Sequence, residues 1–382
     1  MVDASDHDGS TAIRRERRRQ RAHERWAAER TPPSAPLRVR ARSLTDASDV
    51  LSHNTWDNVS FTAEEEAAAE ALVTAQPLAG DAAVDECRLR AAARWDKHYE
   101  ENLRNYKDRR WLQNEFPGLT QHLENAAGAA PFTVLESGCG VGNTLLPLMK
   151  LSERICALGC DHAPIAVRLA NERLAREGVP TARARAFVWD IGRPLPEGEL
   201  PAGGVDVILA IFTLSALPPE VIPVALANLR SCLKPGGICL FRDYGRLDAK
   251  QLKFARSTRG RLGGAHGCEW YARGDGTTAF FLTTAALHSL AAAAGFEVAD
   301  VHYDRRLVVN RAEQKRMHRV WVVATLRAPL PSVRVDCSGT PLLATPSRPQ
   351  TTLAFAALAV ALAVGVAVAV SRGHRMATAA AR

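Results

Sequence analysis

From residue 132 to 327, short apolar runs alternate with stretches of helical character, and this alternation restricts the fold more than any other feature of the sequence. It is typical of a doubly wound α/β domain, here with a seven-stranded sheet whose last two strands form a hairpin. We expect strands at 132–136, 155–160, 184–189, 205–211, 237–243, 296–303 and 316–326. Helices are expected near 143–151, 163–177, 218–233 and 283–294, and the "LKPGG" stretch, 233–237, is expected to be a turn.

A glycine-rich turn follows the first expected strand. The stretch "TVLESGCGVGNTLLPLMK", 133–150, places Gly138, Gly140 and Gly142 directly after an apolar run. The dinucleotide pattern G-x-G-x-x-G is not met, because Asn143 stands at its third glycine, and no Lys-Ser/Thr pair follows as in a P-loop. The turn therefore predicts a nucleotide-like ligand that need not carry a phosphate.

Two aspartates end the next two expected strands. Asp161 lies at the spacing where a carboxylate can accept hydrogen bonds from both ribose hydroxyls, and Asp190 is placed to bind an adenine amino group. An acidic site favours a cationic ligand. S-adenosylmethionine, which has a sulfonium and an ammonium group but no phosphate, fits better than a nicotinamide dinucleotide. The alternative is a glycine turn that serves packing alone.

Seven further stretches carry a family resemblance. They are "HNTWDNVSFTAEEEAAAE", "RWDKHYEENLRNYKDRRWLQNEFP", "ESGCGVGNTLLPL", "IFTLSALPPE", "LFRDYGRLDAKQLKF", "YARGDGT" and "DRRLVVNRAEQKRMHRVWV". In this order they resemble the methyltransferase-like tRNA N3-methylcytidine enzymes, from about residue 53 to 327. The resemblance implies a class I, Rossmann-like S-adenosylmethionine-dependent methyltransferase that methylates N3 of a cytidine in the tRNA anticodon loop, usually at position 32. It also implies an N-terminal helical extension that helps recognise the anticodon arm.

The resemblance assigns cofactor contacts residue by residue. Trp95 and Tyr99 lie four residues apart, so they share one face of a helix, although composition alone would make them ordinary core aromatics. The cofactor-binding residues that the resemblance and the glycine turn imply are Trp95, Tyr99, Gly138, Gly140, Asp161, Asp190, Ile191 and Ile211.

Methylation of cytosine N3 needs no general base, because this nitrogen is unprotonated at neutral pH and has an in-plane lone pair. An acceptor for the N4 amino group would select cytosine, and Asp243 in "FRDYG" is the candidate catalytic residue. Arg306 is expected to bind the cytosine carbonyl or a phosphate, and Arg109 and Arg242 are further candidates for substrate binding. Structural ion pairs are the alternative for Asp243 and Arg306.

Other features bear on the substrate and on metals. The net charge of +8 follows a general richness in Arg, so it is weak evidence for nucleic-acid binding. Thr278 stands where the family usually has a basic residue, which leaves the tRNA species open. The eight cysteines form no C-x-x-C pair, and we expect no metal site. A methyltransferase of a protein or small molecule, and a catalytically silent membrane-tethered scaffold, remain as alternatives.

The segments outside the core have distinct compositions. We expect a basic, disordered arm at 1–50, the tRNA-binding extension and cofactor lid at 51–130, the catalytic domain at 131–327 and a Pro-rich linker at 328–350. Residues 351–371 carry no charge and predict a transmembrane helix, followed by a short basic tail at 372–382. This pattern predicts a tail anchor in the mitochondrial outer membrane, peroxisomes or the endoplasmic reticulum, with the catalytic domain facing the cytoplasm. The need for a protein partner, such as an aminoacyl-tRNA synthetase, stays open.

Overall fold

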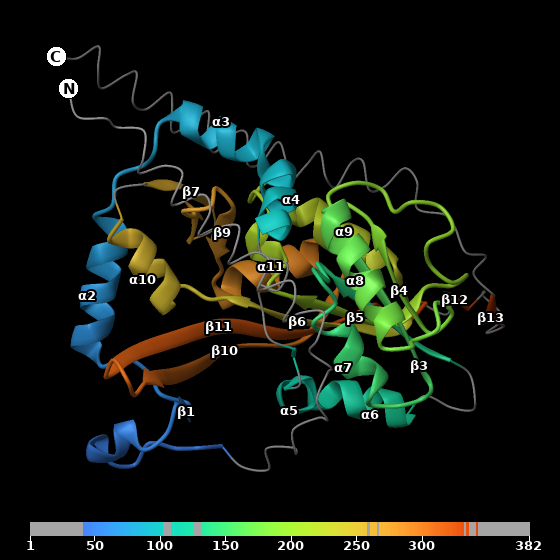
Figure 1. Cartoon of the computed structure of the whole chain (residues 1–382), viewed down its shortest axis with the longest axis horizontal. Coiled ribbons are helices and arrows are strands. Elements are labelled where there is room, and N and C mark those ends of the chain that lie inside the picture. The colour runs from blue at the N-terminus through green and yellow to red at the C-terminus, as the bar shows by residue number, and fades with distance from the viewer. Residues whose placement is uncertain are drawn as a thin grey trace, which may run out of the picture.

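A single large sheet organises the molecule. The computed structural model describes residues 41–101, 108–109, 111–125, 131–257, 260–265, 267–331, 334–335 and 341–342. Its eight-stranded sheet has the order β1-β10-β11-β6-β5-β2-β3-β4 (Figure 1). The strands from β6 to β4 pair in parallel, and β1, β10 and β11 pair antiparallel. The predicted doubly wound sheet with a terminal hairpin is therefore confirmed.

The predicted elements correspond closely to the observed ones. The seven expected strands are β2 (Phe132–Ser137), β3 (Ile155–Asp161), β4 (Ala184–Val188), β5 (Val205–Ile211), β6 (Leu233–Tyr244), β10 (Glu297–Asn310) and β11 (Lys315–Arg327). The four expected helices are α7 (Leu145–Met149), α8 (Pro164–Arg176), α9 (Ile222–Ser231) and α11 (Thr284–Ala293).

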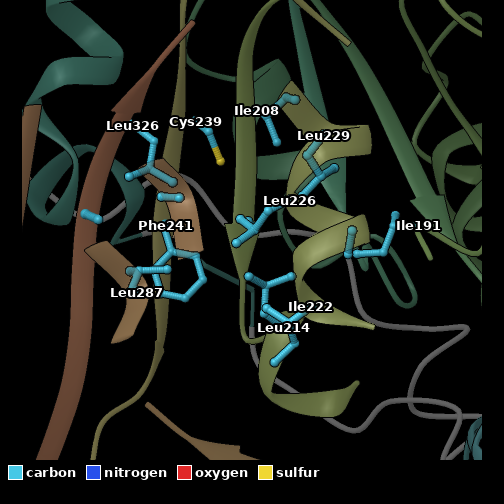
Figure 2. Close-up of a cluster of buried hydrophobic side chains, with 14 of the residues drawn as sticks. Ile191, Ile208, Leu214, Ile222, Leu226, Leu229, Cys239, Phe241, Leu287 and Leu326 are labelled. Carbon is cyan, nitrogen blue, oxygen red and sulfur yellow. The ribbon is translucent and has the colours of Figure 1, made fainter. Parts of the chain in front are cut away.

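The sheet is covered on both faces, and alternating side chains of its strands enter two different cores. In β2, Val134 joins one cluster and Leu135 the other, and the same alternation separates Leu240 from Phe241 in β6. Figure 2 shows the core that contains Phe241, in which Leu226 of α9 and Leu287 of α11 pack near this ring. In Figure 1, α9 and α11 lie on one side of the sheet, and the short helices α5 (Leu112–Glu115) and α6 (Pro117–Asn125) on the other.

Three local features differ from the sequence prediction. An eighth strand, β1 (Thr55–Asp57), pairs with the long hairpin strand β10, and the "LKPGG" stretch starts β6 where a turn was expected. A separate three-stranded sheet contains β7 (Arg261–Ala265), β8 (Cys268–Ala272) and β9 (Thr278–Phe281), preceded by α10 (Ala249–Ala255). This sheet was not predicted, because its first strand contains two glycines, which are rare in strands.

The N-terminal extension is largely helical, as expected. Helix α2 (Ala63–Thr74) begins with a capping box, in which Thr62 and Glu65 accept hydrogen bonds from each other's backbone N–H groups. It is followed by α3 (Asp81–Leu89) and α4 (Ala91–Glu101). The 3-10 helix η1 (Ala47–Leu51), which starts within the predicted arm, buries Val50. Residues 1–40 of the predicted basic arm, most of the linker and the tail at 372–382 lie outside the described residues.

The prediction of a membrane anchor is corrected. None of the helices in the described ranges is long and apolar enough to cross a bilayer. The predicted span, 351–371, itself lies outside the described residues. The prediction rested on composition, and from Leu353 to Val370 eight of the residues are Ala, which adds little to the free energy of insertion. The transmembrane helix and membrane localisation are therefore withdrawn.

Candidate active site

The glycine-rich turn follows β2 and touches two other elements. Gly138 has a φ of +65°, and a Cβ atom there would lie 2.7 Å from Oγ1 of Thr213. The Thr213 hydroxyl in turn donates to the carbonyl oxygen of Ser137, over 2.7 Å. A Cβ at Gly140 would lie 2.8 Å from the hydroxyl oxygen of Tyr99. Only glycine fits at both positions, and the turn brings bare backbone to the edge of a cavity.

Asp161 and Asp190 are held by backbone hydrogen bonds beside this turn. The two carboxylate oxygens of Asp161 accept hydrogen bonds from the N–H groups of Gly140 (2.9 Å) and Ala163 (3.0 Å). Burial raises the pKa of Asp161. Asp190 accepts a hydrogen bond from the N–H of Gly192 over 2.9 Å, and its side chain is about half exposed. Because each carboxylate oxygen can accept more than one hydrogen bond, both residues can also bind a ligand.

A cavity of about 320 Å³ lies against these residues. Its lining includes Gly138, Asp161, Asp190 and Ile191, with Trp95 and Tyr99 of α4 on another side. The basic residues in the described lining are Arg88, His162 and Arg193. Nε of Arg88 lies 2.6 Å from Glu220, Nδ1 of His162 lies 3.6 Å from Asp161, and Nε of Arg193 lies 3.4 Å from Asp190. Among the described residues, each basic side chain of the lining thus lies beside a carboxylate, and the site offers carboxylates and close backbone to a ligand. These features fit S-adenosylmethionine.

Helix α4 forms this wall because it is fixed to the turn between β8 and β9. The guanidinium of Arg94 donates to the carbonyl oxygen of Gly276 over 2.6 Å, and Nδ1 of His98 lies 3.2 Å from Oδ2 of Asp275. The rings of Trp95 and Tyr99 lie 6.0 Å apart, on the same face of α4 as expected from their spacing. A helix from the extension thus contributes two residues to the lining of the cavity in the catalytic domain.

A second cavity, of about 390 Å³, adjoins the first. The two cavities share Trp95, Tyr99, Gly138, Phe212 and Ala216 in their linings. The second cavity adds three aromatic residues, Trp111, Tyr244 and Trp321, and four basic ones, Arg109, Lys250, Arg273 and Arg319. No carboxylate belongs to this lining as far as the described residues show. The first cavity therefore combines two carboxylates with basic side chains, whereas the second is basic and aromatic.

The comparisons with known proteins give the family. A family model described as a methyltransferase domain matches residues 135–239. The chain is 37% identical over 320 residues to the tRNA N(3)-cytidine methyltransferase METTL2 of Danio rerio, with 75% of this chain and 88% of the relative covered. It is 35% identical to a tRNA N(3)-methylcytidine methyltransferase of Drosophila melanogaster, with 77% and 90% covered. The chain belongs to the tRNA N3-methylcytidine methyltransferase family.

A longer relative extends the same comparison. The tRNA(Thr) (cytosine(32)-N(3))-methyltransferase of Saccharomyces cerevisiae is 37% identical over 303 residues, with 77% of this chain but 46% of the yeast protein covered.

The class I methyltransferase fold is confirmed, and S-adenosylmethionine is the cofactor of this tRNA N3-methylcytidine methyltransferase family member.

For this member of the family, the structure places the predicted cofactor residues unevenly. Seven of the eight line one or both cavities: Trp95, Tyr99, Gly138, Gly140, Asp161, Asp190 and Ile191. Ile211 is fully buried at the end of β5 and lines neither cavity, and its carbonyl oxygen accepts a hydrogen bond from Arg109 over 3.3 Å. The next residue, Phe212, lines both cavities, with an unusual φ of +56°.

The predicted substrate arginines are engaged inside the protein. Arg109 lines the second cavity, but its guanidinium donates to buried Glu136 over 2.6 Å. Arg242 is 4% exposed and pairs with Glu115 (3.0 Å) and Asp304 (2.6 Å). Arg306 contacts the same two carboxylates, and its Nε donates to Asp304 over 3.0 Å. The latter two arginines therefore join α5 to the sheet and do not reach a cavity.

Asp243 is placed differently from the prediction as well. Its side chain is fully buried and lines neither cavity. One carboxylate oxygen accepts the N–H of Ser215 over 2.9 Å, and the other accepts the N–H of Tyr244 over 2.8 Å. Burial raises the pKa of Asp243 to about 6, despite these hydrogen bonds. A direct contact with a cytosine amino group is not open to this carboxylate in the described structure.

Sequence reasoning missed several residues of the second cavity. Tyr244 follows Asp243 directly, and Arg319 and Trp321 lie in the "MHRVWV" part of a quoted stretch. Arg273 begins the turn after β8. The aromatic and basic side chains next to the chosen residues were the available signal, but nothing in the local sequence shows which side of a strand faces a cavity.

Proposed function

We propose that this chain transfers a methyl group from S-adenosylmethionine to N3 of a cytidine in the tRNA anticodon loop, at position 32. Membership of the family and the printed activities of the relatives support this proposal. The observation that carries it is the shared wall of the two cavities, with Gly138 and Phe212 at the junction. A ligand in the first cavity and a base in the second cavity can therefore meet there.

The chain's own residues contribute mainly by positioning. The bound cofactor supplies an electrophilic methyl group. Asp161 and Asp190 are proposed to bind its ribose and adenine, and Trp95 and Tyr99 to cover it. Tyr244, which is partly exposed, offers an aromatic surface for a base turned out of the loop. Because the lone pair of cytosine N3 is already free, holding it in line with the methyl group can contribute roughly 7–11 kcal/mol.

Asp243 receives a modified role in this proposal. Its carboxylate accepts hydrogen bonds from the backbone N–H groups of Ser215 and Tyr244. Tyr244 lines the second cavity, and so does Ala216, the residue after Ser215. We assign Asp243 as a positioning residue that keeps Tyr244 in place. With no carboxylate in the described lining, recognition of the N4 amino group falls to neutral acceptors.

The extension and any protein partner belong to the proposal too. We propose that residues 51–130 bind the anticodon arm and close over the cofactor, since α4 already walls both cavities. An aminoacyl-tRNA synthetase partner remains a prediction. It is tested by asking whether the purified chain alone modifies tRNA or does so only when a synthetase is added.

The direct experiment is nucleoside mass spectrometry. The purified full-length chain is incubated with S-adenosylmethionine and transcribed tRNA, which is then digested to nucleosides. We expect N3-methylcytidine, and none when the cofactor is omitted. Parallel reactions with a protein extract and with small metabolites distinguish the alternative acceptors, and methyl transfer confined to either of those would overturn the proposal.

A further inference from the structure

Three basic side chains of the second cavity lie close enough together to interact electrostatically. Lys250 comes from α10, Arg273 from the turn after β8 and Arg319 from β11. All three line the cavity together with Tyr244 and Trp321. Because they belong to three elements that are distant in sequence, the fold itself assembles the cluster.

The charges of this cluster are not balanced. Arg319 donates from Nε to Asp248 over 2.8 Å, and buried Asp248 also accepts the backbone N–H of Lys250 over 2.8 Å. Within the described residues, no ion pair is found for the ammonium of Lys250 or the guanidinium of Arg273. Asp243 attracts Arg273 through space, but the described residues show no ion pair within 4 Å between these two side chains. The cluster can therefore accept an anion.

The repulsion among these positive charges affects the pKa of Lys250. Partial burial lowers the pKa of Lys250, and the charges of Arg319, Lys253 and Arg273 lower it further. A negative ligand at this place would relieve the repulsion, and the ammonium would donate hydrogen bonds to it as a charged group.

Aromatic rings fix the positions of the two guanidinium groups. That of Arg319 lies 4.8 Å from the ring centre of Trp321. That of Arg273 lies 5.8 Å from the ring centre of Tyr244 and 5.9 Å from that of Trp95, which also lines the cofactor cavity. Stacking leaves the N–H groups at the edge of a guanidinium available as donors. The cationic cluster thus adjoins the wall where the cavities meet.

We propose that Lys250, Arg273 and Arg319 bind a backbone phosphate that flanks the target nucleotide, and so hold its base beside the methyl group. The proposal rests on the proposed function. A nucleotide turned out of a loop carries its phosphates with it, and contacts to phosphates position an RNA without reading its sequence. The basic side chains of the cavity would then bind the phosphate of a nucleotide, and its aromatic lining would bind the base.

The test is a binding experiment, so it does not depend on catalysis. Full-length protein is titrated with tRNA assembled by ligation, carrying a neutral methylphosphonate at the linkage on the 5′ or the 3′ side of the target cytidine. Wild type is compared with Lys250→Gln and Arg273→Gln. The control Arg176→Gln removes the same charge from the exposed end of α8, away from both cavities.

We expect one of the two neutral linkages to weaken binding to wild type by about tenfold, as for a lost charged hydrogen bond. The same linkage should weaken binding to Lys250→Gln or Arg273→Gln much less, and each variant should flatten the salt dependence by about 0.7 in slope. If the neutral linkage and the substitution weakened tRNA binding independently, so that their effects on the binding free energy added, the phosphate site would be wrong. The absence of any tRNA binding would overturn it as well. Binding with the expected coupling but without methylation would instead count against the proposed function alone.

Discussion

Nδ1 of His98 lies 3.2 Å from Oδ2 of Asp275, and this contact ties the cofactor wall to the turn between β8 and β9. His98 is buried on the helix that carries Trp95 and Tyr99. Asp275 belongs to the same turn as Arg273. Burial alone would raise the pKa of Asp275, but hydrogen bonds from His98 and Thr277 hold it well below its usual range. This carboxylate therefore stays ionised at every physiological pH.

Breaking this contact should loosen the cofactor wall. We expect Asp275→Asn to weaken S-adenosylmethionine binding about fivefold, as for the loss of roughly 1 kcal/mol from a partly exposed hydrogen bond. Calorimetric titration measures the affinity. The matched control is Asp300→Asn, which disrupts the exposed His302–Asp300 pair (2.8 Å) on β10 and should leave the affinity unchanged. Equal cofactor affinities in the two variants would show that Asp275 does not support the cofactor wall.

The glycine turn can be tested with a pair of alanine substitutions. Gly138→Ala places a Cβ 2.7 Å from Thr213 Oγ1, so we expect S-adenosylmethionine binding to fall at least tenfold. Gly178 has a similar φ of +72°, but a Cβ there meets nothing within 4 Å. Gly178→Ala should cost about 1 kcal/mol of stability, from backbone strain alone, without changing affinity. A Gly138→Ala variant that binds the cofactor normally would show that the turn does not contact it.

The ion-pair network predicts a structural role for Arg306. Arg306→Ala leaves Glu115 and Asp304 with one cation fewer in a largely buried place, and should lower the free energy of unfolding by about 3 kcal/mol. The control is Arg305→Ala, which loses a stacking contact with Tyr303 worth about 0.5–1 kcal/mol. Urea unfolding measures both. If Arg306→Ala kept full stability but lost methylation, the original assignment to substrate binding would stand.

Burial of Asp243 predicts a pH dependence of stability. Its pKa in the folded protein is about 6, above the ordinary value of 3.8. The contribution of protonated Asp243 to the free energy of unfolding is therefore fully present below pH 3.8. It is lost as the pH rises through 6, and the total loss is on the order of 3 kcal/mol. Glu136, whose burial raises its pKa to about 7, acts in the same direction.

The measurement is urea unfolding at several pH values between 4 and 7. We expect stability to fall across this range in wild type and to fall less steeply in Asp243→Asn. The slope is compared, not the absolute stability, because Asn also loses one acceptor for a backbone N–H. An unchanged slope would show that Asp243 is ionised throughout.

The sequence predicted the central strands well because of how they are buried. Strands such as β2 and β5 have a helix layer on both faces, so nearly every residue is buried and their apolar stretches stand out in the sequence. Asp161, at the end of β3, and Asp190, just after β4, were predictable because neighbouring parallel strands end at one edge of the sheet. The strand β7 was hidden because Gly263 and Gly264 read as a loop.

The misplaced site residues share another cause. Arg242 and Arg306 are held by Glu115, which is distant from both in sequence, and no local pattern reveals such a pairing. Asp243 sits at a strand end, as a site residue would, but its side chain turns to backbone N–H groups of its neighbours. The side on which a residue faces is decided by tertiary packing, beyond the reach of sequence patterns.

The central claim, methyl transfer to N3 of one anticodon-loop cytidine, is tested most directly with a deuterated donor. Full-length protein receives S-adenosylmethionine with a CD₃ methyl group, and tRNA carrying either cytidine or uridine at position 32. Mass spectrometry of the digested nucleosides should show CD₃-labelled N3-methylcytidine from the first tRNA and no label from the second. Label in another nucleoside, or N3-methylcytidine that persists after the replacement, would contradict the claim.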